Sequence, residues 1–173
     1  MAERAPVTTL SRDGADVLAI PEIRVDAALK TTGRARYTGD VYPAGALWAR
    51  FLMSPYPHAR IASIDVSAAR AVDGVRAVLT ADDIGRRRFG RLVSDWPVLA
   101  SGKVRYVGER IVAVAADTPY AAEEAIKRID VRYEELPAVF DAEYALRDGA
   151  PVLHPDAEAY DAAGKFPTVP HPN

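Results

Sequence analysis

The 173-residue sequence contains no cysteine. The chain therefore has no thiol with which to form a disulfide, a thiolate zinc site or a cysteine-ligated iron–sulfur cluster, and it has no cysteine nucleophile. Long apolar runs are also missing, since the longest, such as 111–116, are far too short to span a bilayer. The first residues lack the apolar core of a secretory signal, so we expect a cytoplasmic location.

An excess of charge of one sign is absent as well. The sequence has 22 lysines and arginines and 24 aspartates and glutamates, which gives a formal net charge of -2. Such a balance produces no global basic field, so nucleic-acid binding is not expected as a main role. Hydrophobic residues at 49% and charged residues at 27% are ordinary for a soluble globular protein.

The pattern of the sequence divides the chain into three regions. Residues 1–30 are weakly patterned and are interpreted as an extended N-terminal arm, with a disordered terminus as the alternative. Residues 31–147 carry regular patterning and are predicted to form the folded domain. Residues 148–173 are rich in proline and are interpreted as a linker or an extended C-terminal strap.

Strands are predicted where apolar and aromatic residues alternate or run together in the middle region. One of them, Ile111–Ala115, is apolar on both faces, which predicts a buried central strand. The prolines after Ser54 predict a rigid corner. The predicted strands are Leu47–Met53, Ile61–Val66, Val75–Leu79, Val104–Val107, Ile111–Ala115 and Asp130–Glu134.

A helix is predicted to begin at Thr118-Pro119, because a hydroxyl cap is followed by proline at the first helical position. Its predicted apolar face consists of Ala122, Ala125, Ile126 and Ile129. Two i,i+4 ion pairs are predicted on its surface, Glu123–Lys127 and Glu124–Arg128. With the strands on either side, this helix predicts a strand–helix–strand unit over Ile111–Tyr133.

Shorter helical turns are predicted after two hydroxyl residues. Ser67 is expected to cap a turn over 68–72 that Gly74 closes with a positive φ, and Thr80 is expected to cap a second turn. Together these elements predict the α+β class, with a mixed β-sheet and short packed helices.

The three histidines, His58, His154 and His171, each stand beside a proline in a turn-like context. Their spacing is not that of metal ligands on a helix, so loop and capping roles are favoured over metal binding. The sequence has no HExxH, Walker-type or GxSxG motif, and its glycines form no GxGxxG, so a Rossmann cofactor site is not supported.

Glu109 follows Gly108 between two predicted strands and could act as a general base. The interpretation we favour is that it caps the turn or pairs with an arginine. A hydrolase site that uses Ser54, His58 and Glu109 stays open formally, but no group that would orient the histidine is indicated.

An arginine-rich loop surrounds Phe89 and contains Arg86, Arg87, Arg88 and Arg91. It could bind phosphate or an acidic partner, or it could be a solvated surface loop, and both interpretations stay open. From the residues alone we assign no catalytic, cofactor-binding or metal-binding residue. A binding or assembly module, or a part of a larger enzyme, is favoured.

Ordered blocks of the sequence resemble the start of the molybdenum-cofactor subunit in the xanthine dehydrogenase/aldehyde oxidase family of molybdenum hydroxylases. The similarity covers about residues 24–156. The blocks are Gly33–Asp40, Ser54–Arg60, Gly74–Thr80 with 82–84, Val104–Glu109, Ile111–Ala115, Ala121–Glu124 and Tyr133–Pro137.

The resemblance implies the α/β hammerhead fold. It also implies a heteromeric complex that oxidises aldehydes, N-heterocycles or related substrates, with a molybdenum–pterin cofactor, two [2Fe–2S] clusters and in some cases FAD. The family's pterin-binding segments and catalytic glutamate lie C-terminal to this region, and Glu109 is not that glutamate. The cofactors are therefore expected on partner chains: a molybdenum-binding large subunit, an iron–sulfur subunit and, in some cases, a flavin subunit.

Two hypotheses follow. The first is a non-catalytic hammerhead subunit, or a fragment, that packs against the molybdenum-cofactor subunit and is not an enzyme alone. The alternative is a free-standing binding or assembly module with the same fold that recognises an acidic ligand or partner through the loop arginines. The substrate, the electron acceptor and the stoichiometry of the complex do not follow from the sequence, nor does whether the chain is a natural split subunit.

Overall fold

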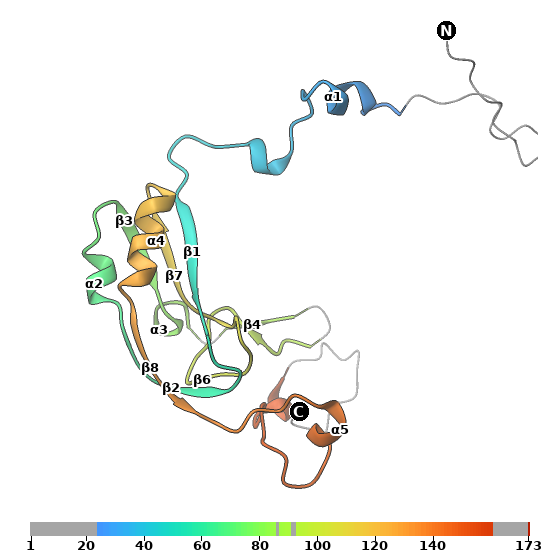
Figure 1. Ribbon diagram of the computed structural model, residues 1–173, viewed down its shortest axis with the longest axis vertical. Helices are drawn as coiled ribbons and strands as arrows, with labels where there is room; N and C mark the ends of the chain where they lie inside the picture. The colour runs from blue at the N-terminus through green and yellow to red at the C-terminus, as the bar shows by residue number, and fades with distance from the viewer. Residues whose placement is uncertain (1–23, 86, 91–92, 161–172) are drawn as a thin grey trace, which may run out of the picture. The chain divides into compact units, whose positions relative to one another are not determined.

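The computed structural model describes residues 24–85, 87–90, 93–160 and 173 (Figure 1). The chain divides into two compact units, Met1–Ala44 and Gly45–Asn173. The first unit contains the helix α1 (Ala27–Thr31) and the short 3-10 turn η1 (Thr38–Asp40). Most of the predicted arm, together with residues 161–172 of the predicted strap, lies outside the described residues.

The described residues of the second unit form two small three-stranded sheets and one two-stranded ribbon, and all of their strand pairs are antiparallel. The first sheet has the order β1 (Trp48–Met53), β7 (Arg110–Ala116), β3 (Val75–Leu79). The second has the order β6 (Lys103–Val104), β2 (Ala59–Asp65), β8 (Asp130–Glu135). The ribbon pairs β4 (Arg88–Phe89) with β5 (Trp96–Pro97).

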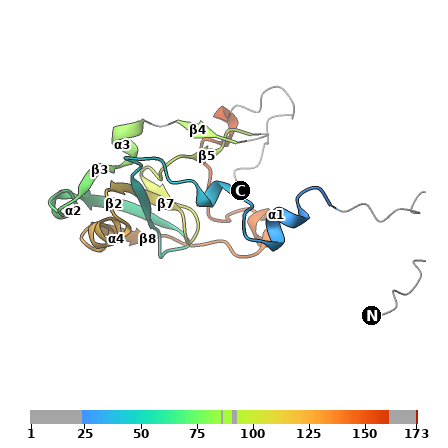
Figure 2. The same cartoon turned by 90° about the horizontal axis from the view of Figure 1, so that it is seen from above.

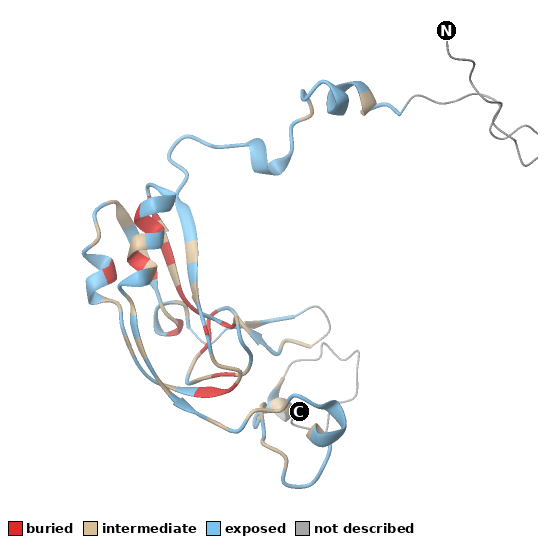
Figure 3. Ribbon diagram, viewed as in Figure 1, coloured by how far each residue is buried: buried red, intermediate tan, exposed pale blue. Residues whose placement is uncertain are grey.

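Strand β7 is the centre of the first sheet, as its two apolar faces predict. Val112, Val114 and Ala116 are fully buried on one face, where they stand opposite alternate residues of β1. Figure 3 shows the buried residues concentrated along this strand and the helix beside it. The core of the unit therefore lies between β7 and the elements packed on this face.

The helix α4 (Pro119–Lys127) covers that face of the first sheet. The Thr118 hydroxyl accepts a hydrogen bond from the backbone N–H of Ala121 at 3.1 Å, so the predicted cap is confirmed. The two predicted i,i+4 ion pairs are replaced by other pairs. Lys127 bonds to Glu124 at 2.8 Å, and Glu123 reaches Arg50 on β1 because it lies on the side of α4 that faces this strand.

Four shorter helices complete the described fold: α2 (Ser67–Arg70), α3 (Ala81–Ile84), α5 (Ala142–Ala145) and the 3-10 turn η2 (Ala157–Ala159). Figures 1 and 2 show α2 and α4 side by side at one end of the strands. None of the helices in the described part of the chain is both long and apolar enough to cross a membrane.

The predicted caps of the two short turns differ in outcome. The Thr80 backbone N–H and hydroxyl donate to the Asp83 carboxylate at 2.7 and 2.8 Å, so the capped turn is confirmed. The prediction for Ser67 is wrong, because Ser67 is itself the first helical residue and its backbone N–H donates to the Asp65 carboxylate at 2.9 Å. Gly74 has the predicted positive φ, at 81°.

The α+β class with short packed helices is confirmed, and the structure refines the sheet. The strands on either side of α4 belong to different sheets, so β7–α4–β8 is a connection between two antiparallel sheets rather than a unit within one mixed sheet. The strand predicted over Val104–Val107 ends at Val104, because the chain turns there to reach Gly108.

Candidate functional site

Glu109 is the most deeply buried carboxylate singled out by the sequence, with only 2% of its surface exposed. Its carboxylate accepts a hydrogen bond from the backbone N–H of Arg105 at 2.5 Å and lies 3.7 Å from the guanidinium of the same residue. Burial raises the pKa of Glu109, and the hydrogen bond and charge of Arg105 oppose that rise. The favoured interpretation, a turn carboxylate paired with an arginine, is confirmed.

Ser54 and His58 are buried, but each is engaged elsewhere. The Ser54 hydroxyl donates to the backbone carbonyl of Tyr56 at 2.9 Å and accepts from the backbone N–H of the same residue at 3.0 Å. His58 Nδ1 lies 2.7 Å from the carbonyl oxygen of Pro137, which is a contact between a loop and the end of β8. These contacts give both side chains structural roles and do not assemble a Ser–His–Glu triad.

The ribbon and the start of the predicted strap are joined by Arg88. Its guanidinium pairs with the Asp156 carboxylate and lies over the Tyr160 ring, 4.3 Å from its centroid. His154 Nδ1 lies 2.9 Å from the hydroxyl of Tyr160, and burial lowers the pKa of His154. Arg88 therefore binds this chain's own C-terminal segment, which is a role that the sequence did not indicate.

The structure does not place the other loop arginines, or the third histidine, beside Arg88. Arg87 is exposed, while Arg86, Arg91 and His171 lie outside the described residues. Within the ranges that the structure describes, no three His, Asp or Glu side chains come close enough together to hold a metal ion.

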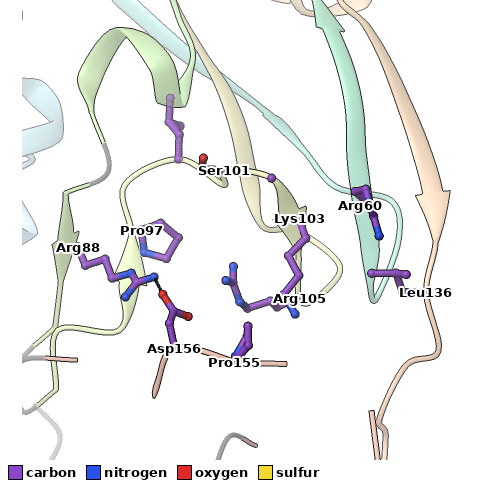
Figure 4. Close-up of a pocket in the computed structure, with 11 residues that line it drawn as sticks. Arg60, Arg88, Pro97, Ser101, Lys103, Arg105, Leu136, Pro155 and Asp156 are labelled. Atoms are coloured by element: carbon purple, nitrogen blue, oxygen red, sulfur yellow. Dashed lines mark hydrogen bonds and ion pairs between the residues drawn. The ribbon is translucent and has the colours of Figure 1, made fainter. Parts of the chain in front are cut away.

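A cavity of about 610 Å³ lies between β2, β6, β5 and the segment that Arg88 holds (Figure 4). Its described lining includes four cationic side chains and one carboxylate: Arg60, Arg88, Lys103, Arg105 and Asp156. The sequence analysis did not single out Arg60, Lys103 and Arg105, because Arg60 lies far along the chain from the other two. The alternation of Lys103 and Arg105 about buried Val104 was the available signal.

The face of the first sheet that points away from α4 is apolar and open. We call it the open face, and its residues are Ala49, Phe51, Met53, Ala77, Leu79, Ala113 and Ala115. Phe51, Met53 and Leu79 keep 39%, 51% and 40% of their surface exposed. At its edge, the Arg110 guanidinium lies 5.0 Å from the centroid of the Phe51 ring.

The outer face of the second sheet has the opposite character. Arg60 on β2 stands opposite Glu134 on β8, and their side chains are 3.4 Å apart. Arg132 lies 3.9 Å from Asp130 on the same strand. A charged face of this kind is suited to solvent, whereas an apolar sheet face is normally covered by another layer of protein.

The comparisons with known proteins identify the class of this fold. Residues 32–137 match the profile described as "Aldehyde oxidase and xanthine dehydrogenase, a/b hammerhead domain". The chain is 41% identical over 145 residues to the nicotinate dehydrogenase large molybdopterin subunit of Eubacterium barkeri, a match that covers 83% of this chain and 34% of that protein. It is 44% identical over 135 residues to a probable xanthine dehydrogenase subunit of Bacillus subtilis, covering 78% of this chain and 18% of that protein.

A solved structure gives the same result. The chain superimposes on CO dehydrogenase from Oligotropha carboxidovorans with a TM-score of 0.75 and 38% identity, covering 79% of this chain and 18% of the other. The chain therefore belongs to the aldehyde oxidase and xanthine dehydrogenase family and is its α/β hammerhead domain. The family identified from the sequence blocks is confirmed. The chain spans about a third of the nicotinate dehydrogenase subunit and about a fifth of the other two proteins.

Iron–sulfur clusters are held by cysteine thiolates, and the sequence has no cysteine. The buried polar groups described above, Glu109 and His58, are bonded to their own chain and present no open donor set for a pterin or a metal.

Proposed function

We propose that this chain is the hammerhead part of a multi-subunit molybdenum hydroxylase or dehydrogenase and that it packs against the molybdenum-cofactor-binding part of that enzyme. Its role is structural rather than catalytic. The observation that carries the proposal is the open face, because Phe51, Met53 and Leu79 form an apolar sheet surface that lacks a covering layer among the described residues.

Burial of the open face would supply the driving force for this packing. Apolar surface gains about 25 cal/mol for each Å² removed from water, and aromatic and methionine side chains are enriched at interface cores. The charged outer face of the second sheet, with Arg60 and Glu134, favours solvent and indicates which side stays outside. The contact is therefore expected on the first sheet.

The cofactors follow from this assignment. A molybdenum–pterin cofactor would be held by the large subunit, [2Fe–2S] clusters by an iron–sulfur subunit and, in complexes that have one, FAD by a flavin subunit. The complex would oxidise aldehydes, N-heterocycles or related substrates. The relatives support this range, since one is named for nicotinate and another for xanthine.

The alternative, a free-standing module that reads an acidic ligand with the loop arginines, has less support. Arg88 is already paired with Asp156, and Arg87, which is exposed, is the other loop arginine within the described residues.

The proposal is tested by purifying the native protein that carries this sequence and measuring its metals and its activity. We expect molybdenum and iron in a fixed ratio to the chain, and oxidation of a purine, another heterocycle or an aldehyde with an artificial electron acceptor. A native preparation that is free of molybdenum-binding protein would contradict the proposal.

A matched pair of variants locates the contact. Phe51→Asp places a charge in the open face, whereas Arg132→Asp changes an exposed residue of β8. The first is expected to lower recovery of the molybdenum-binding part while circular dichroism of the chain is unchanged, and the second is expected to leave recovery unchanged. Equal recovery with both variants would remove the open face from the interface.

A further inference from the structure

Two cations in the 610 Å³ cavity lack full charge compensation. Lys103 has no carboxylate within ion-pair distance among the described residues, and its ammonium donates to the backbone carbonyl of Val152 at 3.0 Å. The side chain of Arg105 is 13% exposed, and its Nε donates to the carbonyl of Leu153 at 3.1 Å. Its carboxylate neighbour is the buried Glu109, 3.7 Å away. Each of the two cations therefore donates one hydrogen bond to a neutral carbonyl, and Glu109 is the carboxylate beside Arg105.

The neighbourhood of Lys103 combines partial burial with charges of both signs. Burial lowers the pKa of Lys103 and the nearby Arg105 charge lowers it further, while the charges of Asp156 and Glu109 oppose this shift. Its Nζ also lies 3.4 Å from His58 Nε2, a ring nitrogen that offers no negative charge. An anion beside these two cations would relieve their mutual repulsion.

The volume of the cavity is in the range of small-molecule pockets. Its volume of about 610 Å³ falls within the range of roughly 300–1,000 Å³ that ligand pockets occupy. Pro97, Leu99 and Leu136 supply apolar walls, and Ser101 adds a hydroxyl. Figure 4 shows Lys103 and Arg105 between the Arg88–Asp156 pair on one side and Arg60 on the other.

We propose that this cavity is a binding site for a small phosphorylated molecule. The phosphate is held by Lys103 and Arg105, and the apolar walls receive the rest of the ligand. Arg60 lines the side of the cavity next to β2, where its charge is paired with Glu134. Arginine and lysine together suit phosphate, since arginine offers a planar pair of donors and lysine a compact charge. Only the chain's own residues form the site, so the proposal does not depend on the proposed function.

Isothermal titration of the full chain with pyrophosphate tests the site. We expect saturable binding that weakens as sodium chloride is raised, because exposed charges are screened by salt. Lys103→Met is expected to weaken binding by about tenfold or more, the usual effect of losing a charge-assisted hydrogen bond. Lys127→Met is the matched control, since this exposed lysine of α4 lies outside the cavity.

A second measurement on the unaltered chain covers the case in which Lys103→Met does not fold. Amine acetylation is followed by mass spectrometry at Lys103 and Lys127, with and without pyrophosphate. Protection confined to Lys103 supports the site. Absent binding, equal affinity of the two variants, or protection by an acidic peptide but not by pyrophosphate would each overturn the proposal.

Discussion

The carboxylate of Glu109 and the backbone N–H of Arg105 lie 2.5 Å apart, across the turn that joins β6 to β7. The same turn is bound to the loop after β1, because the backbone N–H of Ser54 donates to the Glu109 carbonyl at 2.8 Å. A buried carboxylate thus fixes the entry to the central strand. Its chemistry is structural, although its position at a strand junction is one where a catalytic base could also stand.

Replacing Glu109 with glutamine should change stability in a pH-dependent way. Burial raises the pKa of Glu109 above its unfolded value, so the folded state holds this proton more tightly. Ionisation of Glu109 therefore lowers the stability of the folded chain. This loss is absent below the pKa that Glu109 has in the unfolded chain, and it is complete above the pKa that Glu109 has in the folded chain. Relative to the natural chain, Glu109→Gln should gain stability as pH rises through that window.

Urea unfolding of both proteins at about pH 4 and about pH 8, on either side of the ordinary glutamate pKa, measures this effect. Glu135→Gln, at an exposed position on β8, controls for the loss of one negative charge. If Glu109→Gln were instead less stable than the natural chain at the higher pH, the stabilisation from pairing with Arg105 would exceed the cost of burying the charge.

Removing the cap of α4 should cost stability by a local mechanism. The Thr118 hydroxyl satisfies the backbone N–H of Ala121, and Thr118→Ala is expected to lower the free energy of unfolding by about 1 kcal/mol. Ser63→Ala is the control, because its exposed hydroxyl on β2 makes no hydrogen bond within the described part of the chain. Equal losses in chemical denaturation would show that the cap contributes nothing specific.

Gly74 should resist substitution because of its backbone. Its φ of 81° is one that other residues rarely adopt, and Gly74→Ala is expected to cost about 1–2 kcal/mol. Crowding is not the cause, since an added Cβ would meet Ala121 at 3.5 Å, an ordinary contact. Gly39→Ala, where nothing lies within 4 Å, should leave the melting temperature nearly unchanged. Matching shifts in the two variants would refute the backbone explanation.

Local signals in the sequence predicted local structure well. The bounds of β3 and the Thr118 cap were predicted correctly, because alternation and capping depend on residues near one another. The Ser67 cap was wrong because Asp65, two residues earlier, supplies the carboxylate that binds the helix N-terminus.

Contacts between distant segments could not be predicted in this way. The sequence did not show that β7 and β8 belong to different sheets, since the pattern within a strand does not determine which strands pair. Nor did it show that Lys103 binds the carbonyl of Val152, 49 residues away. The open face could not be predicted from the sequence for a similar reason. Phe51 and Leu79 come together only once β1 and β3 flank β7.

The most direct test of the central claim is a photo-cross-linking amino acid placed at Phe51 in the native complex, with the same residue at Arg132 as the control. Mass spectrometry then identifies the cross-linked peptides. The account predicts that position 51 cross-links to the molybdenum-cofactor-binding part and that position 132, on the charged face, does not. An intact molybdenum-containing complex in which position 51 forms no such cross-link would contradict it.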